Sequence, residues 1–258
     1  MSKLTFLGVW MTPDVGETVS FAFDIGSKNK VLVDCGTNLV GSLIKNGIDP
    51  SEITHLIITH SHGDHISGLP TYLFYRLLIE PGILKKTLQP LQIIGTKNTI
   101  ENVKKYIRAS YGNMVDNSFL RFVEIKANDI YSIDNITFQF FQTKHQPETI
   151  GFCVNVCGRK IVYSSDTGIS YDIMSCAENA DILIHDVVGT SEYSMLSNSH
   201  TLCNEISPLL AKYNIKNFYP VHRLSIYKDD IKKYREELER NYQGNIIIPN
   251  DGDAIFLE

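Results

Sequence analysis

The stretch Ile53–Pro70, ITHLIITHSHGDHISGLP, places three imidazoles and a carboxylate directly after an apolar run. The run Leu56-Ile57-Ile58 has the composition of a buried strand, and the ligand-type side chains that follow it are His60, His62, Asp64 and His65. A single histidine near an apolar strand is usually a packed residue, but packing alone would place apolar side chains at these positions. The cluster therefore predicts a site that carries chemistry at the end of a strand.

The same arrangement recurs in the second half of the chain, where several apolar runs end in a polar side chain. These polar residues are His145 after ITFQFFQTK, Asp166 after KIVYSS, His185 and Asp186 after DILI, and His222 after IKNFYPV. Ligands at the ends of several strands converge on one edge of a sheet, where a rigid scaffold can hold a metal. For His185 a strand-end residue without chemistry is the preferred interpretation, and His55 is taken as structural.

The residue types indicate which metal the site would hold. Neutral imidazoles and carboxylates suit Zn²⁺, with Mn²⁺ or Fe²⁺ as alternatives, and the cysteines are not positioned as ligands. Seven such groups (His60, His62, Asp64, His65, His145, Asp166 and His222) are too many for one tetrahedral ion and predict two ions per chain. Two ions held together generate a nucleophile at neutral pH and stabilise the charge of an attacked phosphoryl group.

Composition favours a globular protein and gives no support for binding to a long nucleic acid or a membrane. The 258 residues are 43% hydrophobic and 21% charged, enough for a substantial core, and the net charge of −5 does not favour a grip on a long nucleic acid. No C-x-x-C pair occurs among the five cysteines, which we expect to be small buried residues in a reducing compartment. No signal pattern or membrane-length apolar run is seen, so we expect a cytoplasmic protein with no membrane partner.

Strand and helix patterns alternate along the chain. Strands are expected near residues 3–9, 19–24, 31–34, 54–59, 91–94, 136–143, 151–156, 160–164, 182–184 and 217–221, and helices near 37–45, 71–84, 98–110, 202–213 and 229–242. This order predicts a mixed α/β (α+β) fold, a four-layer αββα sandwich forming a single domain over residues 1–258, with pseudo-symmetric halves at roughly 1–125 and 126–258. The apolar segment 71–84 is expected to be a core helix, with a dimer contact as the alternative.

Four segments together resemble a known family. THSHGDHISGLP resembles the signature of the metallo-β-lactamase superfamily, and the later segments resemble its ribonuclease Z-like short phosphodiesterase branch. IVYSSDTG is similar to that branch's SGDT segment with Ser165 in place of glycine, and ILIHDVV to its HEAT segment with Asp186 in place of glutamate. SHTLCNEISPLLAKYNIKNFYPVHRLS is similar to its paired distal histidine segments. The resemblance spans nearly the whole chain.

The resemblance implies a role for each ligand-type residue. His60, His62 and His145 would bind the first ion, Asp64, His65 and His222 the second, and Asp166 would bridge them. His200 and Asp186 occupy the positions of the proton-donating pair, and together with Asp64 they are the expected catalytic residues. An imidazole hydrogen-bonded to a carboxylate can protonate a leaving alkoxide, although aspartate reaches one methylene less far than glutamate. For His200 the alternative is a solvated histidine in a loop.

The substrate prediction depends on an insertion that this chain lacks. Ribonuclease Z enzymes that process tRNA carry a long arm between their third histidine motif and the bridging aspartate, whereas only 20 residues separate His145 from Asp166 here. A large RNA is therefore not expected as a partner. The closest resemblance is to the anti-Pycsar phosphodiesterases of phages. It implies hydrolysis of 3′,5′-cyclic nucleotides such as cCMP, cUMP, cAMP and cGMP to monophosphates, to counter antiviral signalling, and a homodimer. Cyclic-phosphate enzymes of bacterial phosphonate metabolism are related alternatives.

Other interpretations remain open at this stage. The main alternative is a ribonuclease Z-type tRNA 3′-end processing endonuclease. A thioester or β-lactam hydrolase would not need the donor pair of His200 and Asp186, a di-iron redox protein would usually add a flavin domain, and a non-catalytic module need not keep all seven ligands. Trp10 and Met11 in the first loop are candidates to stack on a base, with a core or interface role as the alternative.

Overall fold

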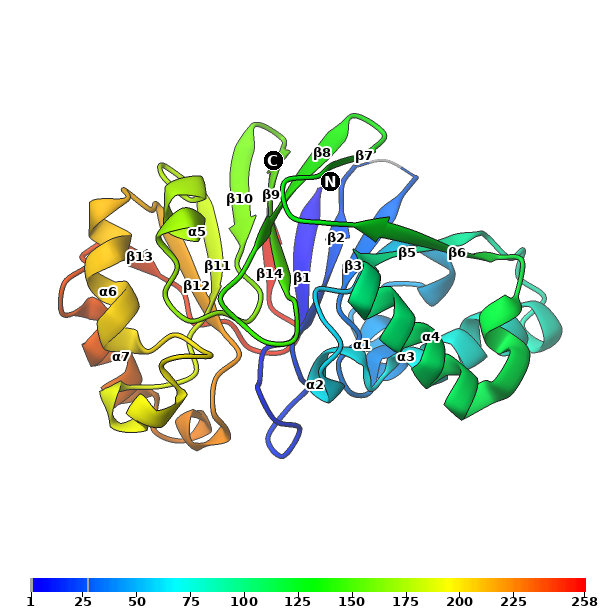
Figure 1. The fold of residues 1–258 in the computed structure, drawn as a ribbon, viewed down its shortest axis with the longest axis horizontal. Coiled ribbons are helices and arrows are strands. Elements are labelled where there is room, and N and C mark those ends of the chain that lie inside the picture. Colours follow the sequence, from blue (N-terminus) through cyan, green and yellow to red (C-terminus); the bar gives the residue numbers. More distant parts are fainter. Residues whose placement is uncertain (1, 27) are drawn as a thin grey trace. The chain divides into compact units, whose positions relative to one another are not determined.

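The computed structural model describes residues 2–26 and 28–258, which form two compact units with one seven-stranded sheet each (Figure 1). Unit 1 comprises Met1–Gly8, Glu17–Ile125 and Asp251–Glu258, and unit 2 comprises Val9–Gly16 and Lys126–Asn250. Both units mix helices with a sheet, so the predicted α/β class is confirmed. The arrangement of these units as a single domain stays a prediction.

The sheet of unit 1 is antiparallel at one side and parallel at the other. Its strands lie in the order β14 (Ala254–Phe256), β1 (Lys3–Gly8), β2 (Ser20–Asp24), β3 (Lys30–Val33), β4 (Ile53–Ile57), β5 (Leu91–Thr96) and β6 (Leu120–Ile125). Pairing is antiparallel from β14 to β3 and parallel from β3 to β6. The parallel strands β3 and β4 are almost continuously buried, as strands covered on both faces must be.

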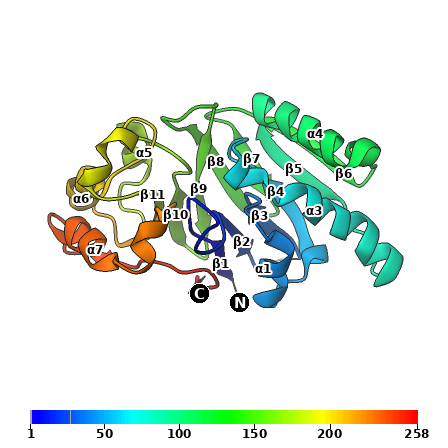
Figure 2. The same ribbon diagram turned by 90° about the horizontal axis from the view of Figure 1, so that it is seen from below.

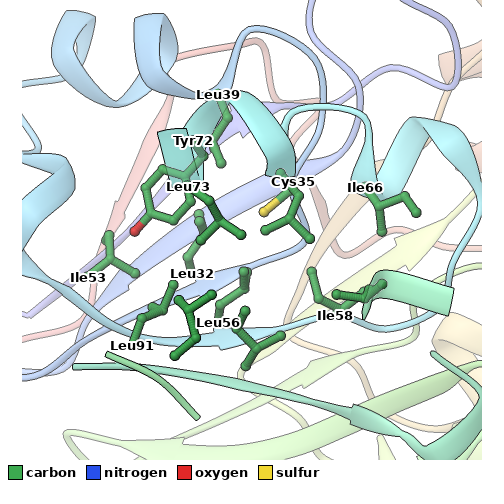
Figure 3. Close-up of a cluster of buried hydrophobic side chains, with 14 of the residues drawn as sticks. Leu32, Cys35, Leu39, Ile53, Leu56, Ile58, Ile66, Tyr72, Leu73 and Leu91 are labelled. Carbon is green, nitrogen blue, oxygen red and sulfur yellow. The ribbon is translucent and has the colours of Figure 1, made fainter. Parts of the chain in front are cut away.

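Helices cover one face of this sheet. They are α1 (Leu39–Lys45), α2 (Gly63–Ile66), α3 (Leu69–Phe74), a π-helical segment (Tyr75–Ile83) and α4 (Lys97–Tyr111), and Figure 2 shows α1, α3 and α4 alongside β3 to β6. A buried apolar cluster fills the space between helices and sheet, with Leu32, Leu56 and Tyr72 at its centre (Figure 3). The predicted core helix 71–84 thus begins at Leu69 and changes to π-helical geometry at Tyr75.

The sheet of unit 2 repeats this mixture of pairings. Its strands lie in the order β13 (Asn245–Ile246), β12 (Asn217–Val221), β11 (Ile182–Asp186), β10 (Arg159–Tyr163), β9 (Ile150–Val156), β8 (Ile136–Gln142) and β7 (Ile130–Ile133). Pairing is antiparallel from β7 to β10 and parallel from β10 to β13. In both units, therefore, the parallel strands deliver their carboxyl ends to one edge of the sheet, which is where α/β sheets bind ligands.

The helices of unit 2 pack against these parallel strands. They are α5 (Tyr171–Cys176), α6 (Cys203–Lys212) and α7 (Ile231–Glu239), drawn yellow-green to orange-red in Figure 1, with short 3₁₀ segments at Ser191–Leu196 and Ser225–Lys228. Their apolar faces form a second core around Leu183, Ile206 and Tyr234. Within the described residues no helix is both long and apolar enough to cross a membrane.

The cysteines are free thiols in this structure. Cys35 and Cys203 are buried, as predicted, but Cys157 is exposed in the turn between β9 and β10.

Candidate metal centre

The loop after β4 gathers the four predicted ligands of unit 1. His60 and His62 lie in the loop itself, His62 stands at the N-cap of α2, and Asp64 and His65 lie within that helix. The ring centroid of His60 is 4.8 Å from that of His62 and 4.2 Å from that of His65. The Nε2 atom of His65 lies 3.5 Å from Oδ2 of Asp64. One short loop thus brings imidazole nitrogens and a carboxylate together.

A buried carboxylate that the sequence analysis did not select, Asp34, orients this loop. It follows β3 in the left-handed region (φ 58°) and is fully buried. Its carboxylate accepts hydrogen bonds from the Thr59 amide (2.8 Å), the Thr59 hydroxyl (2.9 Å) and Nδ1 of His65 (2.9 Å). Burial raises the pKa of Asp34, against the opposing effect of His65 and Thr59. With Nδ1 fixed in this way, Nε2 of His65 is the atom left to coordinate a metal.

The backbone around α2 is also held closely. The Thr18 hydroxyl donates to the Asp64 carbonyl at 2.6 Å, and the Cys35 amide donates to the His65 carbonyl at 2.7 Å. A Cβ atom on Gly68 would lie 2.2 Å from the carbonyl oxygen of Gly36, so this close approach requires glycine. The helix that carries Asp64 and His65 is therefore fixed to the end of β3.

In unit 2 three predicted ligands meet at the ends of three different strands. His145 follows β8, Asp166 follows β10 and His222 follows β12. The Nε2 atoms of His145 and His222 lie 3.8 and 3.5 Å from Oδ2 of Asp166. Both imidazoles thus face one carboxylate oxygen, and all three side chains are buried.

The other nitrogen of each of these histidines faces an oxygen atom. Nδ1 of His145 donates to the carbonyl of Ser199 at 2.8 Å, and Nδ1 of His222 lies 3.4 Å from Oδ1 of Asp186. Outer partners of this kind fix the ring orientation of metal-binding histidines and leave Nε2 for the metal.

His200 and Asp186 form the pair that the resemblance implied. Nδ1 of His200 lies 2.9 Å from Oδ2 of Asp186, so the shorter aspartate side chain reaches the imidazole. The Asp186 carboxylate also accepts a hydrogen bond from the Thr167 amide at 2.9 Å. The Asp186 charge raises the pKa of His200, although burial of the imidazole acts to lower it. The imidazoles of His200 and His222 lower the pKa of Asp186, although burial of the carboxylate acts to raise it. The pair therefore favours a protonated His200.

The donor atoms fit the chemistry of a zinc-type ion. Two ligand atoms at ~2.1 Å from a tetrahedral ion lie roughly 3.4 Å apart. The separations of 3.5 Å (His65 to Asp64), 3.8 Å (His145 to Asp166) and 3.5 Å (His222 to Asp166) are close to this value. Asp186, His200 and His222 also offer ligand atoms within 4.8 Å of one another, but Asp186 already accepts hydrogen bonds from His200 and Thr167. That group is better described as an orienting network than as a metal site.

Ser165 departs from the family pattern at a position where the backbone conformation favours glycine. Ser165, which stands where the resembling segment has glycine, has φ 55°, in the left-handed region that glycine adopts without cost. Its hydroxyl is buried with no hydrogen-bond partner among the described residues. The sharp turn at Ser165 directs the neighbouring Asp166 toward His145 and His222, and His222 itself has φ 63°.

The remaining candidates have packing roles. His185 is buried, its Nδ1 donates to the Asp186 carbonyl at 2.8 Å, and burial lowers its pKa. Trp10 is buried, and its ring lies 4.6 Å from the Arg223 guanidinium, which favours the packing role over base stacking. The amide of Met11 donates to the Arg223 carbonyl at 3.0 Å, and stacking by its side chain stays a prediction.

The predicted ligand His145 lines a polar cavity of about 330 Å³. The side chains of Gln142, Lys144, Gln146 and Asn198 line it. Amides and an ammonium group of this kind can bind the polar edge of a base and a phosphate.

Comparison with known proteins gives a consistent assignment. The family model described as anti-Pycsar protein Apyc1 matches residues 3–247. A curated relative, the ribonuclease Z of Picrophilus torridus, is 25% identical over 278 aligned residues, which cover 88% of this chain and 87% of the relative.

Solved structures share the fold. The metallo-β-lactamase fold protein YhfI of Bacillus subtilis has a TM-score of 0.84 at 19% identity and covers 99% of this chain and 100% of its own. Zn²⁺-bound PqqB of Methylobacterium extorquens has a TM-score of 0.78 at 15% identity and covers 98% of this chain and 99% of its own. The predicted metallo-β-lactamase fold is confirmed, and the chain is a metal-dependent hydrolase.

Proposed function

Because the chain belongs to the family of the anti-Pycsar protein Apyc1 and is a metal-dependent phosphodiesterase, we propose that it hydrolyses 3′,5′-cyclic nucleotides to nucleoside monophosphates. The observation that carries this proposal is the His200–Asp186 pair, which stands beside two ligand histidines. The centroid of the His200 ring is 5.0 Å from that of His145 and 5.1 Å from that of His222. A proton donor is thus fixed where the leaving oxygen of a phosphodiester would depart.

The proposal includes the metal ligands. His60, His62 and His145 would hold one ion, Asp64, His65 and His222 the other, and Asp166 would bridge them, in keeping with a family match that spans both units. When bound, two such ions supply a nucleophile from water at neutral pH and stabilise the charge on phosphorus. Zinc is the proposed metal because the ligands are imidazoles and carboxylates.

The chain's own residues then complete the reaction. The oxygen of water bonds to phosphorus and one proton of that water passes to solvent. The bond from phosphorus to the 3′ or 5′ oxygen breaks, and His200 gives its proton to that oxygen and is then reprotonated from solvent. Asp186 holds Nδ1 of His200, so the opposite nitrogen, Nε2, is the donor. Asp186 also stabilises the charged imidazole, which is needed before transfer.

Three features favour a small substrate. The strands β9 and β10 are joined by a turn at Cys157 and Gly158, so residues 146–165 contain no arm. The net charge of −5 does not favour binding of a long RNA, and the cavity beside His145 is about 330 Å³. The curated ribonuclease Z relative supports the second candidate, tRNA 3′-end processing, and the same assay tests both.

The deciding experiment offers zinc-loaded protein a panel of 3′,5′-cyclic nucleotides and, separately, an unprocessed tRNA precursor, with products followed by chromatography. Chelator-sensitive conversion of cyclic nucleotides to monophosphates, with the tRNA intact, is the expected result. An Asp166→Ala preparation, purified in parallel, reveals any contaminating phosphodiesterase. Trimmed tRNA with intact cyclic nucleotides would reject the proposal in favour of the endonuclease.

The proposal also includes a homodimer in the cytoplasm. Leu78, Ile83 and Leu84, in and just after the π-helical segment, are about half exposed or more, with Ile83 at 67%, which supports a contact surface there. Light scattering on the purified protein measures the mass directly, and a monomer at micromolar concentration would reject this part.

A further inference from the structure

A larger cavity, of about 820 Å³, lies in unit 1. It is at the opposite end of the parallel strands from the loop of residues 60–65, here called the metal-binding loop. Residues at or next to the starts of β3, β4, β5 and β6 line it, among them Lys30, His55, Gln92 and Arg121. The metal ligands of this unit follow the other end of β4. The cavity is therefore a separate feature that the proposed reaction does not use.

The register of the parallel strands builds the floor of this cavity. His55 pairs with Gln92, and Gln92 pairs with Arg121, so these side chains form one row on one face of the sheet. The next row on that face, two residues further along each strand, is the apolar Ile57, Ile94 and Val123. The polar row coincides with the cavity, which His55, Gln92 and Arg121 all line.

Hydrogen bonds fix the polar row. His55 is only 6% exposed, its Nε2 lies 2.8 Å from the side-chain nitrogen of Gln92, and its Nδ1 lies 2.8 Å from the Thr54 hydroxyl. Since the Gln92 amide donates, Nδ1 of His55 carries the proton and donates to Thr54, whose hydroxyl donates to the Lys30 carbonyl at 3.3 Å. The floor is thus an ordered polar surface.

The charged side chains around the cavity favour binding of an anion. Among the described residues of the lining, three cations (Lys28, Lys30 and Arg121) stand against one carboxylate, Glu52. Glu52 lies 3.3 Å from Lys30, which also lies 2.8 Å from Asp24. Lys28 and Arg121 are exposed cations that also line the cavity. In a chain of net charge −5, this concentration of positive charge is local. An ammonium and a guanidinium together match the oxygens of a phosphate group.

From this geometry we propose that the cavity binds a phosphate monoester of nucleotide size. The cations Lys28 and Arg121 bind the phosphate, and the row of His55 and Gln92 contacts the uncharged part of the ligand. A volume of about 820 Å³ exceeds what a bare phosphate needs and lies within the range of small-molecule sites. The proposal is independent of the proposed reaction, because it concerns a different edge of the sheet.

Titration of the zinc-loaded protein with ribose 5-phosphate tests this site, with ribose as the uncharged probe. The readout is the NMR signals of the His55 imidazole and the Gln92 side-chain amide, which report this cavity and not catalysis. We expect saturable shifts at both groups with ribose 5-phosphate and none with ribose. Absence of shifts at millimolar ligand, or shifts confined to the metal ligands such as His222, would overturn the proposal.

Two variants and a control localise the binding. Arg121→Ala and Lys28→Ala each remove one exposed cation and are expected to raise Kd by about tenfold. Lys105→Ala removes an exposed cation from α4 of the same unit, outside the cavity, and should leave Kd unchanged. Equal affinity in Arg121→Ala and in the parent protein would reject the site.

Discussion

Each unit has a buried aspartate at the end of a parallel strand, but the two aspartates hold different kinds of partner. In unit 1 Asp34 holds His65 and Thr59, both within or next to the metal-binding loop. In unit 2 Asp186 lies 2.9 Å from His200 and 3.4 Å from His222, a proposed donor and a proposed ligand. Perturbing Asp34 should therefore affect metal binding alone, whereas perturbing Asp186 should affect binding and proton transfer together.

The units also differ in how far apart in the sequence their ligands lie. The proposed ligands of unit 1 come from a single loop and one short helix, His60 to His65. Unit 2 takes His145, Asp166 and His222 from the ends of three strands. Loss of one ligand in unit 1 thus leaves its neighbours on the same loop, while the ligands of unit 2 depend on the register of a whole sheet.

The largest expected effect comes from removing a ligand of unit 1. Asp64→Ala should lower activity by more than about a thousandfold and reduce bound metal, because a carboxylate that offsets the charge of an ion is lost. Metal content by mass spectrometry and turnover of the best cyclic nucleotide measure both. Asp116→Ala, an exposed aspartate of the same unit, is the matched control. An active Asp64→Ala protein would refute the metal assignment.

The next largest effect is expected from removing the proposed proton donor of unit 2. His200→Ala should slow turnover by about a hundredfold to ten-thousandfold, with both metals still bound, because general acid catalysis contributes that much. With bis(4-nitrophenyl) phosphate, whose leaving group needs no proton, the loss should be much smaller. An equal loss on both substrates would show that His200 does not act as the acid.

The two buried aspartates should respond differently when their charge is removed. Asp34→Asn should weaken zinc binding by about 10- to 100-fold and leave kcat at saturating zinc near the parent value. Asp186→Asn should weaken zinc binding and also lower kcat. Because Asp186 raises the pKa of His200, its loss should move the alkaline decline of kcat to lower pH, since the acid then loses its proton earlier. Chelator competition and pH profiles measure these effects, and identical behaviour of the two variants would remove the distinction between the units.

The smallest effect concerns stability. Ser165→Gly removes the backbone strain of a left-handed conformation (φ 55°) and also removes a buried hydroxyl. The free energy of unfolding should therefore rise by about 1 kcal/mol, measured by denaturant titration. Cys157→Gly is the matched control, because Cys157 has φ 52° but an exposed side chain. A gain no larger at Ser165 than at Cys157 would show that the buried hydroxyl has no cost.

Much of this arrangement could be predicted from the sequence, because a strand and the polar residue after it lie within one short segment. Apolar runs ending in His or Asp marked β4, β8, β10, β11 and β12 and the residues that follow them. Asp34 was missed although it directly follows the apolar run VLV, because neither a neighbouring histidine nor a segment resembling the family marks it. Asp186, in contrast, follows ILI and His185. Strand β6 has a mixed burial pattern and β14 has three residues, so neither gave a clear periodic signal. The partners of Asp186 depend on tertiary distances that no spacing encodes.

The path of the chain through unit 1 has a consequence for its synthesis. Strand β14, near the carboxyl end, pairs with β1, near the amino end, through Lys3 with Phe256 and Leu4 with Ile255. The Glu17 amide also donates to the Asp251 carboxylate at 2.8 Å. Until residues 251–256 have left the ribosome, β1 is an unprotected edge strand, and strands of this kind can template intermolecular pairing. The unit whose metal-binding loop is translated first is therefore the unit whose sheet closes last.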